Sequence, residues 1–143
     1  MRDLDFLIQR SILKTGNRLL NIRSDNLKAF DLTPNQSETL LFFDRHPGAI
    51  ILDLKDYLQI SHQAARNLVE RMKEKDLLQA VVSDTDGRAK QIYLSSKGTA
   101  ICNQLKQQGG RVGSELLRVL SETEKENLLH LLEKISSGTI NQR

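Results

Sequence analysis

The fold is decided by residues 61–96, which have the sequence SHQAARNLVERMKEKDLLQAVVSDTDGRAKQIYLSS. In the first half of this stretch, apolar residues recur three and four positions apart, at Ala65, Leu68, Val69 and Met72. Such spacing is typical of an amphipathic helix, whose apolar positions share one face. In the second half the period falls to two on either side of an Asp-Gly turn signal, which predicts a β-hairpin with a charged tip.

A shorter helix precedes this one across a very short turn. Leu54 and Leu58 indicate the shorter helix, and Ser61 is of a residue type that caps helix N-termini well. Two helices joined in this way, the second with two distinct faces, are typical of a helix-turn-helix. Upstream, Ile50 and Ile51 are too few to make an independent strand, but they could pair at a sheet edge.

Two capping boxes mark helix starts elsewhere in the chain. Thr33 and Gln36 can exchange side-chain to backbone hydrogen bonds, and a proline occupies the first helical position between them. This helix should end at residues 46–48, which have the sequence HPG. Ser121 and Glu124 form the same box at the start of the last helix.

Long helices are expected at both ends of the chain. The first covers residues 4–29, and the second begins after Ser95. Three glycines within residues 109–113 interrupt the second, so a kink or a close helix contact is expected there. The terminal helices are richer in Leu and Ile than a small lobe can bury alone, which favours a symmetric homodimer.

The N-terminal turn of the helix after Ser61 offers groups that can recognise DNA. In the major groove, Gln and Asn side chains pair with adenine and Arg pairs with guanine, while a helix N-terminus favours phosphate. The residues expected to contact DNA here are Ser61, His62, Gln63, Arg66, Asn67 and Arg71. We assign base contacts to Gln63 and Arg66, and mainly phosphate contacts to Ser61 and Asn67. Any exposed amphipathic helix carries polar residues, so a solvated face is the alternative for this helix taken alone.

The tip of the predicted hairpin offers a second DNA contact. Arg88 follows the Asp-Gly turn, and Asp84 or Asp86 could hold its guanidinium through a charge-assisted hydrogen bond. A guanidinium is attracted by the negative potential of a narrow minor groove, and Lys90 on the same ribbon could add a phosphate contact. The alternative is a solvated hairpin whose charges neutralise one another.

Together these motifs resemble the MarR family of transcription regulators. The similarity is carried by LTPNQ at residues 32–36, by IS at 60–61, by LVERM at 68–72 and by DTDGRAKQIYLSSKG at 84–98. The last block is the most specific, with an acidic residue, a wing-tip arginine, a Leu-Ser pair and then a glycine. Two positions depart from the family: Asp76 stands where a glycine often ends the recognition helix, and Lys55 where a small residue is usual.

The resemblance implies a mainly α fold with a small β-wing, organised as a single domain over residues 1–143. Residues 32–95 would form the winged helix-turn-helix that binds DNA. Residues 1–31 and 96–137 would form flanking dimerisation helices, and residues 138–143 a flexible tail.

The function implied by the resemblance is that of a homodimeric regulator, with its recognition helices in consecutive major grooves of a pseudo-palindromic operator. Most regulators of this family repress transcription. A small-molecule effector could release the DNA by binding between the dimerisation and DNA-binding regions. Thr33, Asn35 and Gln36 at the start of the second helix join the expected DNA contacts, and Asp86 joins them as the residue that orients Arg88. A winged-helix module that binds another protein is the alternative function.

Composition argues against several other classes of protein. The net charge is +3 and the pI about 9.1, which indicates nucleic acid only weakly. The apolar runs are too short to span a bilayer and the N-terminal residues do not resemble a secretory signal, so a cytoplasmic location is expected. Cys102 is the only cysteine, so it cannot form an internal disulfide, and we expect it to be a packing residue.

Catalytic and metal sites are not expected. His46, His62 and His130 lie far apart without the spacing of a metal site, and no Ser/His/Asp or paired-carboxylate arrangement suggests an enzyme. We therefore expect no enzymatic activity, no cofactor and no metal ion. The expected partners are double-stranded DNA, a second copy of the chain and a small-molecule effector.

Overall fold

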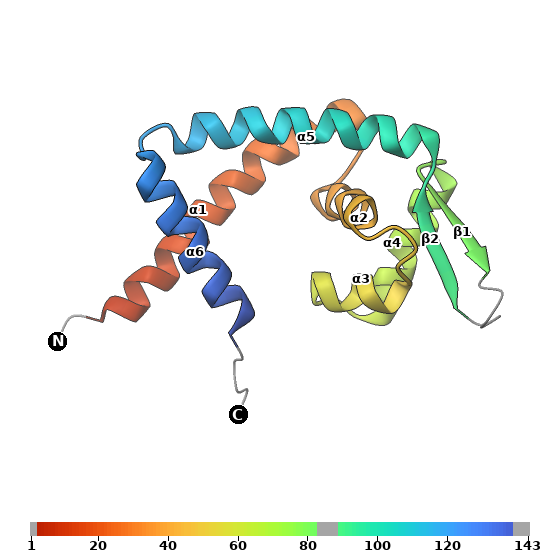
Figure 1. Cartoon of the computed structure of the whole chain (residues 1–143), viewed down its shortest axis with the longest axis horizontal. Coiled ribbons are helices and arrows are strands. Elements are labelled where there is room, and N and C mark those ends of the chain that lie inside the picture. The colour runs from red at the N-terminus through yellow and green to blue at the C-terminus, as the bar shows by residue number, and fades with distance from the viewer. Residues whose placement is uncertain (1–2, 83–88, 139–143) are drawn as a thin grey trace. The chain divides into compact units, whose positions relative to one another are not determined.

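The computed structural model describes residues 3–82 and 89–138 of the chain. Its helices are α1 (Leu4–Leu27), the short 3-10 helix η1 (Lys28–Phe30), α2 (Pro34–Arg45), α3 (Ile51–Leu58), α4 (His62–Glu74), α5 (Ser96–Leu117) and α6 (Glu122–Ser137). Between α4 and α5 lies a hairpin of β1 (Leu78–Val82) and β2 (Lys90–Leu94) (Figure 1). These elements confirm the expected mainly α fold with a small β-wing. Residues 1–108 and 109–143 form two compact units.

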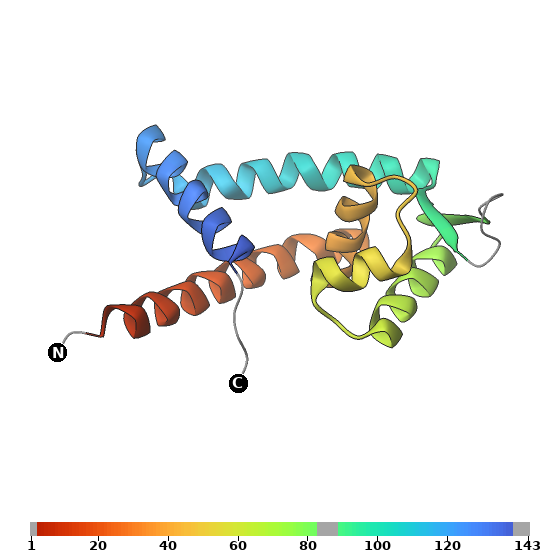
Figure 2. The same cartoon turned by 60° about the horizontal axis from the view of Figure 1, so that its bottom comes forward.

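The core of the first unit lies where α2, α3, α4 and the hairpin meet (Figure 2). Phe43, Leu54, Met72 and Ile92 each come from a different one of these elements, and each is at most 1% exposed. Burial of side chains of this size contributes roughly 1.5–3 kcal/mol each. The orientation of α4 is therefore fixed from beneath by apolar packing.

Side-chain caps start several helices, three of them at residues that the sequence predicts. Thr33 Oγ1 accepts a hydrogen bond from the amide of Gln36, and Gln36 Oε1 accepts one from the amide of Thr33, both at 3.2 Å. Ser121 and Glu124 make the same pair of bonds at 2.9 and 3.2 Å. Ser61 Oγ accepts from the amide three residues on at 3.1 Å. Because caps satisfy amides that the first helical turn leaves unbonded, α2, α4 and α6 begin where the sequence predicts.

Left-handed residues end α3 and follow α4. Gln59 has φ 54° and Asp76 has φ 62°. The turn at Asp76 is closed by the amide of Leu77, which donates to the Met72 carbonyl at 2.9 Å. Asp occupies the left-handed region more readily than most residues. Asp76 therefore provides the backbone conformation for which a glycine is often used.

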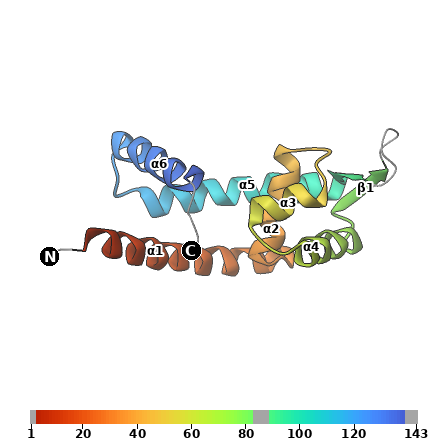
Figure 3. The ribbon, with the colours of Figure 1, turned by 90° about the horizontal axis from the view of Figure 1, so that it is seen from below.

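The hairpin is antiparallel, with Leu78 opposite Leu94 and Val82 opposite Lys90. Its register places Ile92, at the centre of β2, against the core. Figure 3 shows the hairpin beside the first turn of α5, where the amide of Ser95 donates to the Leu77 carbonyl at 3.0 Å.

The main chain before α3 pairs with β2, but not at the predicted residues. The amide of Gly48 donates to the Ile92 carbonyl and the amide of Ile92 donates to the Ala49 carbonyl, each at 2.9 Å. The prediction that Ile50 and Ile51 supply this pairing is wrong. Asp53 Oδ2 accepts from the amide of Ile50 at 3.0 Å, and this cap starts α3 at Ile51.

The glycines expected to interrupt the helix after Ser95 lie inside one continuous helix, and the kink or close helix contact expected there stays a prediction. Helix α5 continues through Gly109, Gly110 and Gly113 to Leu117. Each glycine weakens a helix by about 1 kcal/mol relative to alanine, but unlike proline it keeps its amide donor and causes no clash. Glycines alone therefore do not end a helix that its neighbours in the sequence support.

Helices α1 and α6 each carry large apolar side chains that stay exposed. On α1 the exposed side chains include Leu4, Phe6, Leu7, Ile8, Ile12, Leu13 and Leu20. On α6 they include Leu128, Leu129, Leu131, Leu132 and Ile135. Leu27 is the only buried residue of α1, and α6 has none.

Candidate nucleic-acid interface

Helix α4 has one buried face and one polar, exposed face. Ala65, Val69 and Met72 are at most 2% exposed, which orients the rest of the helix outward. The contacts predicted on this helix and its cap residue are all exposed: Ser61, His62, Gln63, Arg66, Asn67 and Arg71. The packing of α4 therefore presents these side chains together on one accessible surface.

The N-terminus of α4 begins with an extended Ser61, at φ −69° and ψ 157°. Its hydroxyl is already used as the helix cap, because it accepts from the amide of Ala64. The amides at the very start of a helix have no partner within that helix and favour an anion such as phosphate. Ser61 therefore shapes a helix end of the kind that favours an anion.

Gln63 and Asn67 lie one helical turn apart and are hydrogen-bonded. Gln63 Nε2 donates to Asn67 Oδ1 at 2.9 Å. This bond leaves Gln63 Oε1 as an acceptor and Asn67 Nδ2 as a donor. An adenine edge in the major groove presents a donor and an acceptor, so the two amides together match it, whereas the sequence alone assigned Asn67 mainly to phosphate.

A single open groove joins α4 to the start of α3 and to the hairpin. It has a volume of about 630 Å³ and is lined by Ile50, Ile51, Leu52, His62, Arg66, Glu70, Ala89 and Lys90. The structure thus brings His62, Arg66 and Lys90 together, although Lys90 is far from the other two in sequence. Glu70, the acid of the groove, pairs with Lys73 Nζ at 3.4 Å.

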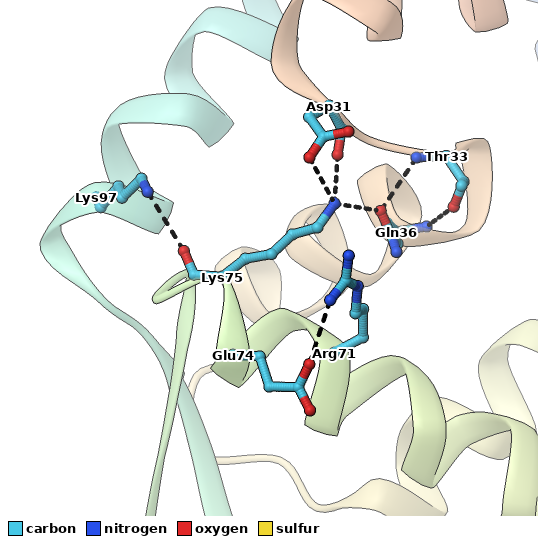
Figure 4. Close-up of polar contacts among 7 residues, drawn as sticks. All are labelled: Asp31, Thr33, Gln36, Arg71, Glu74, Lys75 and Lys97. Atoms are coloured by element: carbon cyan, nitrogen blue, oxygen red, sulfur yellow. Dashed lines mark hydrogen bonds and ion pairs between the residues drawn. The ribbon is translucent and has the colours of Figure 1, made fainter.

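Arg71 lies further along the exposed face of α4 and is paired with Glu74. The distance from the guanidinium to Glu74 Oε2 is 3.2 Å, and the two side chains are 58% and 66% exposed (Figure 4). An exposed ion pair contributes about 0–1 kcal/mol. Arg71 can therefore exchange this partner for a phosphate at little cost.

The residues at the start of α2 that were predicted to contact DNA differ in exposure. Thr33 and Asn35 are exposed, whereas Gln36 is only 9% exposed. Gln36 Oε1 accepts from the Thr33 amide at 3.2 Å and from Lys75 Nζ at 3.1 Å (Figure 4). Gln36 is thus largely buried and already bonded within the protein, unlike the exposed side chains predicted to contact DNA.

The predicted tip residues Asp84, Asp86 and Arg88 lie outside the described residues. Lys90 begins β2 and is exposed.

Sequence reasoning missed Lys75. Its partners Asp31 and Gln36 are 44 and 39 residues away in the chain, and no local pattern signals contacts at such distances. A lysine at the C-terminal end of a helix is ordinarily explained by the helix dipole alone.

Cys102 is fully buried in the first unit, as expected for a packing residue. Burial raises the pKa of its thiol, the charge of Asp44 raises it further, and Lys106 opposes both. Lys106 Nζ lies 2.5 Å from Asp44 Oδ2, and this hydrogen bond raises the pKa of Lys106. Because only the thiolate is reactive, Cys102 is poorly placed for redox chemistry.

Over the described ranges, no helix is both long enough and apolar enough to cross a membrane. In the same ranges, no three His, Cys, Asp or Glu side chains gather as they would around a metal ion.

Comparison with known proteins identifies the family. The MarR family model matches residues 30–89. The multiple antibiotic resistance protein MarR of Salmonella typhimurium is 31% identical over 121 residues, which cover 83% of this chain and 81% of the relative. Among solved structures, a mutant MarR from E. coli complexed with operator DNA is 26% identical, with a TM-score of 0.76 over 92% of each chain. The S. aureus MepR–DNA complex, 24% identical, has the same fold, with a TM-score of 0.80 over 96% of this chain and 98% of that one.

The similarity is therefore not confined to one motif. It covers the helix-turn-helix and most of both chains, and the arrangement of α2, α3, α4 and the hairpin is that of a winged helix. The chain belongs to the MarR family of winged-helix transcriptional regulators.

Proposed function

We propose that the protein binds a pseudo-palindromic DNA operator as a homodimer and represses transcription from it. The observation that carries this proposal is the two-faced α4, which buries Ala65, Val69 and Met72 and exposes Gln63 and Arg66. A rigid helix with donors and acceptors on its outer face fits the major groove. Relatives bound to DNA support the same use of the fold.

Within this interface, α4 contacts the bases, and the groove beside α4 lies along the sugar-phosphate backbone of the DNA. Gln63 and Arg66 contact base edges, with Asn67 held against Gln63 by their hydrogen bond. His62 and Lys90, which line the same groove, lie close to phosphates. Arg88, which the sequence predicts at the tip of the hairpin, enters the adjacent minor groove, where a guanidinium is favoured.

Dimerisation uses the terminal helices. The apolar side chains that α1 and α6 leave exposed, such as Ile8, Ile12, Leu128 and Leu132, are more than an isolated chain is expected to leave in water. A second copy of the chain supplies the same surfaces and covers them symmetrically. The resulting dimer presents two copies of α4 to two half-sites.

A small aromatic anion is the proposed effector. A pocket of about 340 Å³ in the first unit is lined by Glu38, Leu41, Phe42, Arg45, His46, Tyr57 and Lys106. The ring of Phe42 lies 5.0 Å from that of Tyr57 and 4.9 Å from that of His46. Aromatic walls with nearby cations suit an aromatic carboxylate. Benzoate, the simplest such compound, should raise the unfolding temperature and weaken operator binding, as differential affinity for two states requires.

Selection from a library of randomised DNA duplexes tests the proposal. Repeated rounds of binding should enrich an inverted repeat whose half-sites are about one helical turn, or 10 base pairs, apart. Recovery of duplexes without any shared sequence would contradict operator binding. Enrichment of a single, unrepeated half-site would contradict the dimer.

A further inference from the structure

Lys75, the C-cap residue of α4, joins two turns that are distant in sequence (Figure 4). Its Nζ donates to the main-chain carbonyl of Asp31 and, at 3.1 Å, to Gln36 Oε1. Nζ also lies 3.6 Å from Asp31 Oδ2. The Lys75 side chain is 16% exposed, whereas that of Asp31 is 95% exposed. The Lys75 side chain is thus largely covered by the protein, and its ammonium group reaches the turn before α2.

Both turns that Lys75 connects are well defined. Asp31 has φ 55° and ends η1, with its amide donating to the Lys28 carbonyl at 3.1 Å. Asp76 has φ 62°, with its amide donating to the Lys73 carbonyl at 2.9 Å. Each of these turns is closed by a main-chain hydrogen bond, so neither end of the Lys75 contact rotates freely. Lys75 therefore fixes the position of one turn relative to the other better than a bond between two mobile side chains would.

The end of α4 is also held from α5. Ser95 Oγ donates to the Asp76 carbonyl at 2.6 Å, and Lys97 Nζ donates to the Lys75 carbonyl at 3.3 Å. A Cβ built on Gly98 would lie 2.1 Å from the Leu77 carbonyl oxygen, so α5 begins directly against this turn. The C-terminal end of α4 is therefore fixed on two sides.

Lys75 lies at the opposite end of α4 from the residues proposed to contact bases, so a small change of angle at Lys75 moves those residues by a larger distance. Helix α4 has 13 residues, so its two ends are about 20 Å apart at 1.5 Å per residue. If the C-terminal end were loosened by about 5°, the N-terminal turn would move by about 2 Å, which exceeds the tolerance of a hydrogen bond. Gln63 and Arg66 would then miss their base edges.

We propose that Lys75 is a positioning residue for DNA binding, which sets the angle of α4 without touching DNA; the inference rests on the function proposed above. An ammonium has three donors, and Lys75 Nζ already has three oxygens around it: the Asp31 carbonyl, Asp31 Oδ2 and Gln36 Oε1. Two of these donors make hydrogen bonds, the third lies at ion-pair distance from Asp31 Oδ2, and the side chain is only 16% exposed, so a phosphate would have to displace partners within the protein. We therefore expect the effect of Lys75 on DNA binding to pass through α4.

The test measures binding of Lys75→Met to the duplex that the wild-type protein selects from a randomised library, at several salt concentrations. Loss of the three contacts should weaken binding by about tenfold, in the lower part of the range for one lost base contact. The slope of log affinity against log salt should stay unchanged, because no phosphate contact is lost. Lys75→Arg, which keeps the donors and the charge, should recover most of the affinity.

Lys73→Met is the matched control, since Lys73 lies in the last turn of the same helix and pairs only with Glu70 at the surface among the described residues. It removes one charge and should change affinity less than twofold. Lys75→Gln, polar and too short to bridge the turns, should show the same loss as Lys75→Met and serves if Lys75→Met does not fold. Thermal unfolding of each variant establishes that it is folded at the temperature of the binding assay.

Three results would overturn the inference: wild-type affinity in both Lys75→Met and Lys75→Gln, a salt slope lowered by about one, or an equal loss in Lys73→Met. The first result would leave the proposed function intact, since the wild-type protein would still bind its duplex. Failure of the wild-type protein to select any duplex would instead count against the proposed function.

Discussion

Gln63 and Asn67 should act on DNA as one unit rather than as two independent side chains. The hydrogen bond of 2.9 Å from Gln63 Nε2 to Asn67 Oδ1 holds each amide in the orientation that the other needs. Replacing either residue with alanine removes one amide and frees the rotation of the other. The perturbation that exposes this coupling is a double-mutant cycle of Gln63→Ala, Asn67→Ala and the double variant.

The magnitude follows from the contact that is lost. A two-bond contact to a base discriminates by about 1–3 kcal/mol, so each single variant should lose about 2 kcal/mol, or roughly 30-fold in Kd. If the pair is a unit, the double variant loses little more, about 2.5 kcal/mol or roughly 60-fold. Independent side chains would give about 4 kcal/mol, or roughly 700-fold. The predicted coupling of about 1.5 kcal/mol lies within the range for residues in contact.

The assay is fluorescence anisotropy of a labelled duplex selected by the wild-type protein. Stability should barely change, because an exposed pair one turn apart contributes only about 0.2–0.5 kcal/mol to a helix. Asn103→Ala and Gln107→Ala, which remove an exposed pair of the same residue types and spacing on α5, are the matched control and should leave affinity unchanged. Losses at Gln63 and Asn67 that add to within about 0.5 kcal/mol would refute the reasoning.

Three other substitutions test other parts of the molecule. Arg88→Ala should weaken operator binding by about tenfold and lower the salt slope by about one; anisotropy titrations that show no change in either would exclude a DNA contact by this residue. Leu132→Glu places a charge on the exposed apolar face of α6 and should shift the dimer toward monomer in light scattering, while Glu133→Gln should not; a Leu132→Glu protein that stays fully dimeric would remove α6 from the interface. Gly98→Ala should lower the free energy of unfolding by about 3 kcal/mol, because its Cβ would lie 2.1 Å from the Leu77 carbonyl oxygen; a urea unfolding midpoint equal to that of the wild type would show that the turn can move.

The features of the fold that could be predicted from the sequence are local ones. Thr33 with Gln36, and Ser121 with Glu124, exchange hydrogen bonds across a single helical turn, so residue type and spacing are enough to find them. The buried face of α4 follows from helical periodicity for the same reason. The change of period after that helix predicts the hairpin.

The features that could not be predicted depend on distant partners. Pairing of Ile92 with Gly48 and Ala49 depends on where α3 begins, and a side-chain bond from Asp53 decides that position. Whether α5 continues through its glycines depends on whether the residues around them offset the helix stability that each glycine loses relative to alanine.

Within the candidate site, the exposed side chains of α4 could be predicted from the sequence, whereas the buried contacts between distant residues could not. Gln63 and Arg66 lie opposite the apolar stripe of α4, so periodicity alone indicates that they face outward. Gln36 combines a helix-capping role with a contact to Lys75. The position of Lys75, 39 residues further along the chain, can be known only from the packed structure.

The most direct measurement is a titration of the selected duplex and of a scrambled duplex of equal length, each with known amounts of protein. The proposed function predicts two chains bound per selected duplex and an affinity at least about 1,000-fold higher than for the scrambled one, as specific DNA-binding proteins show. Equal affinity for the two duplexes, with both lost together as salt rises, would mean that only phosphates are contacted and would contradict sequence-specific regulation by this protein.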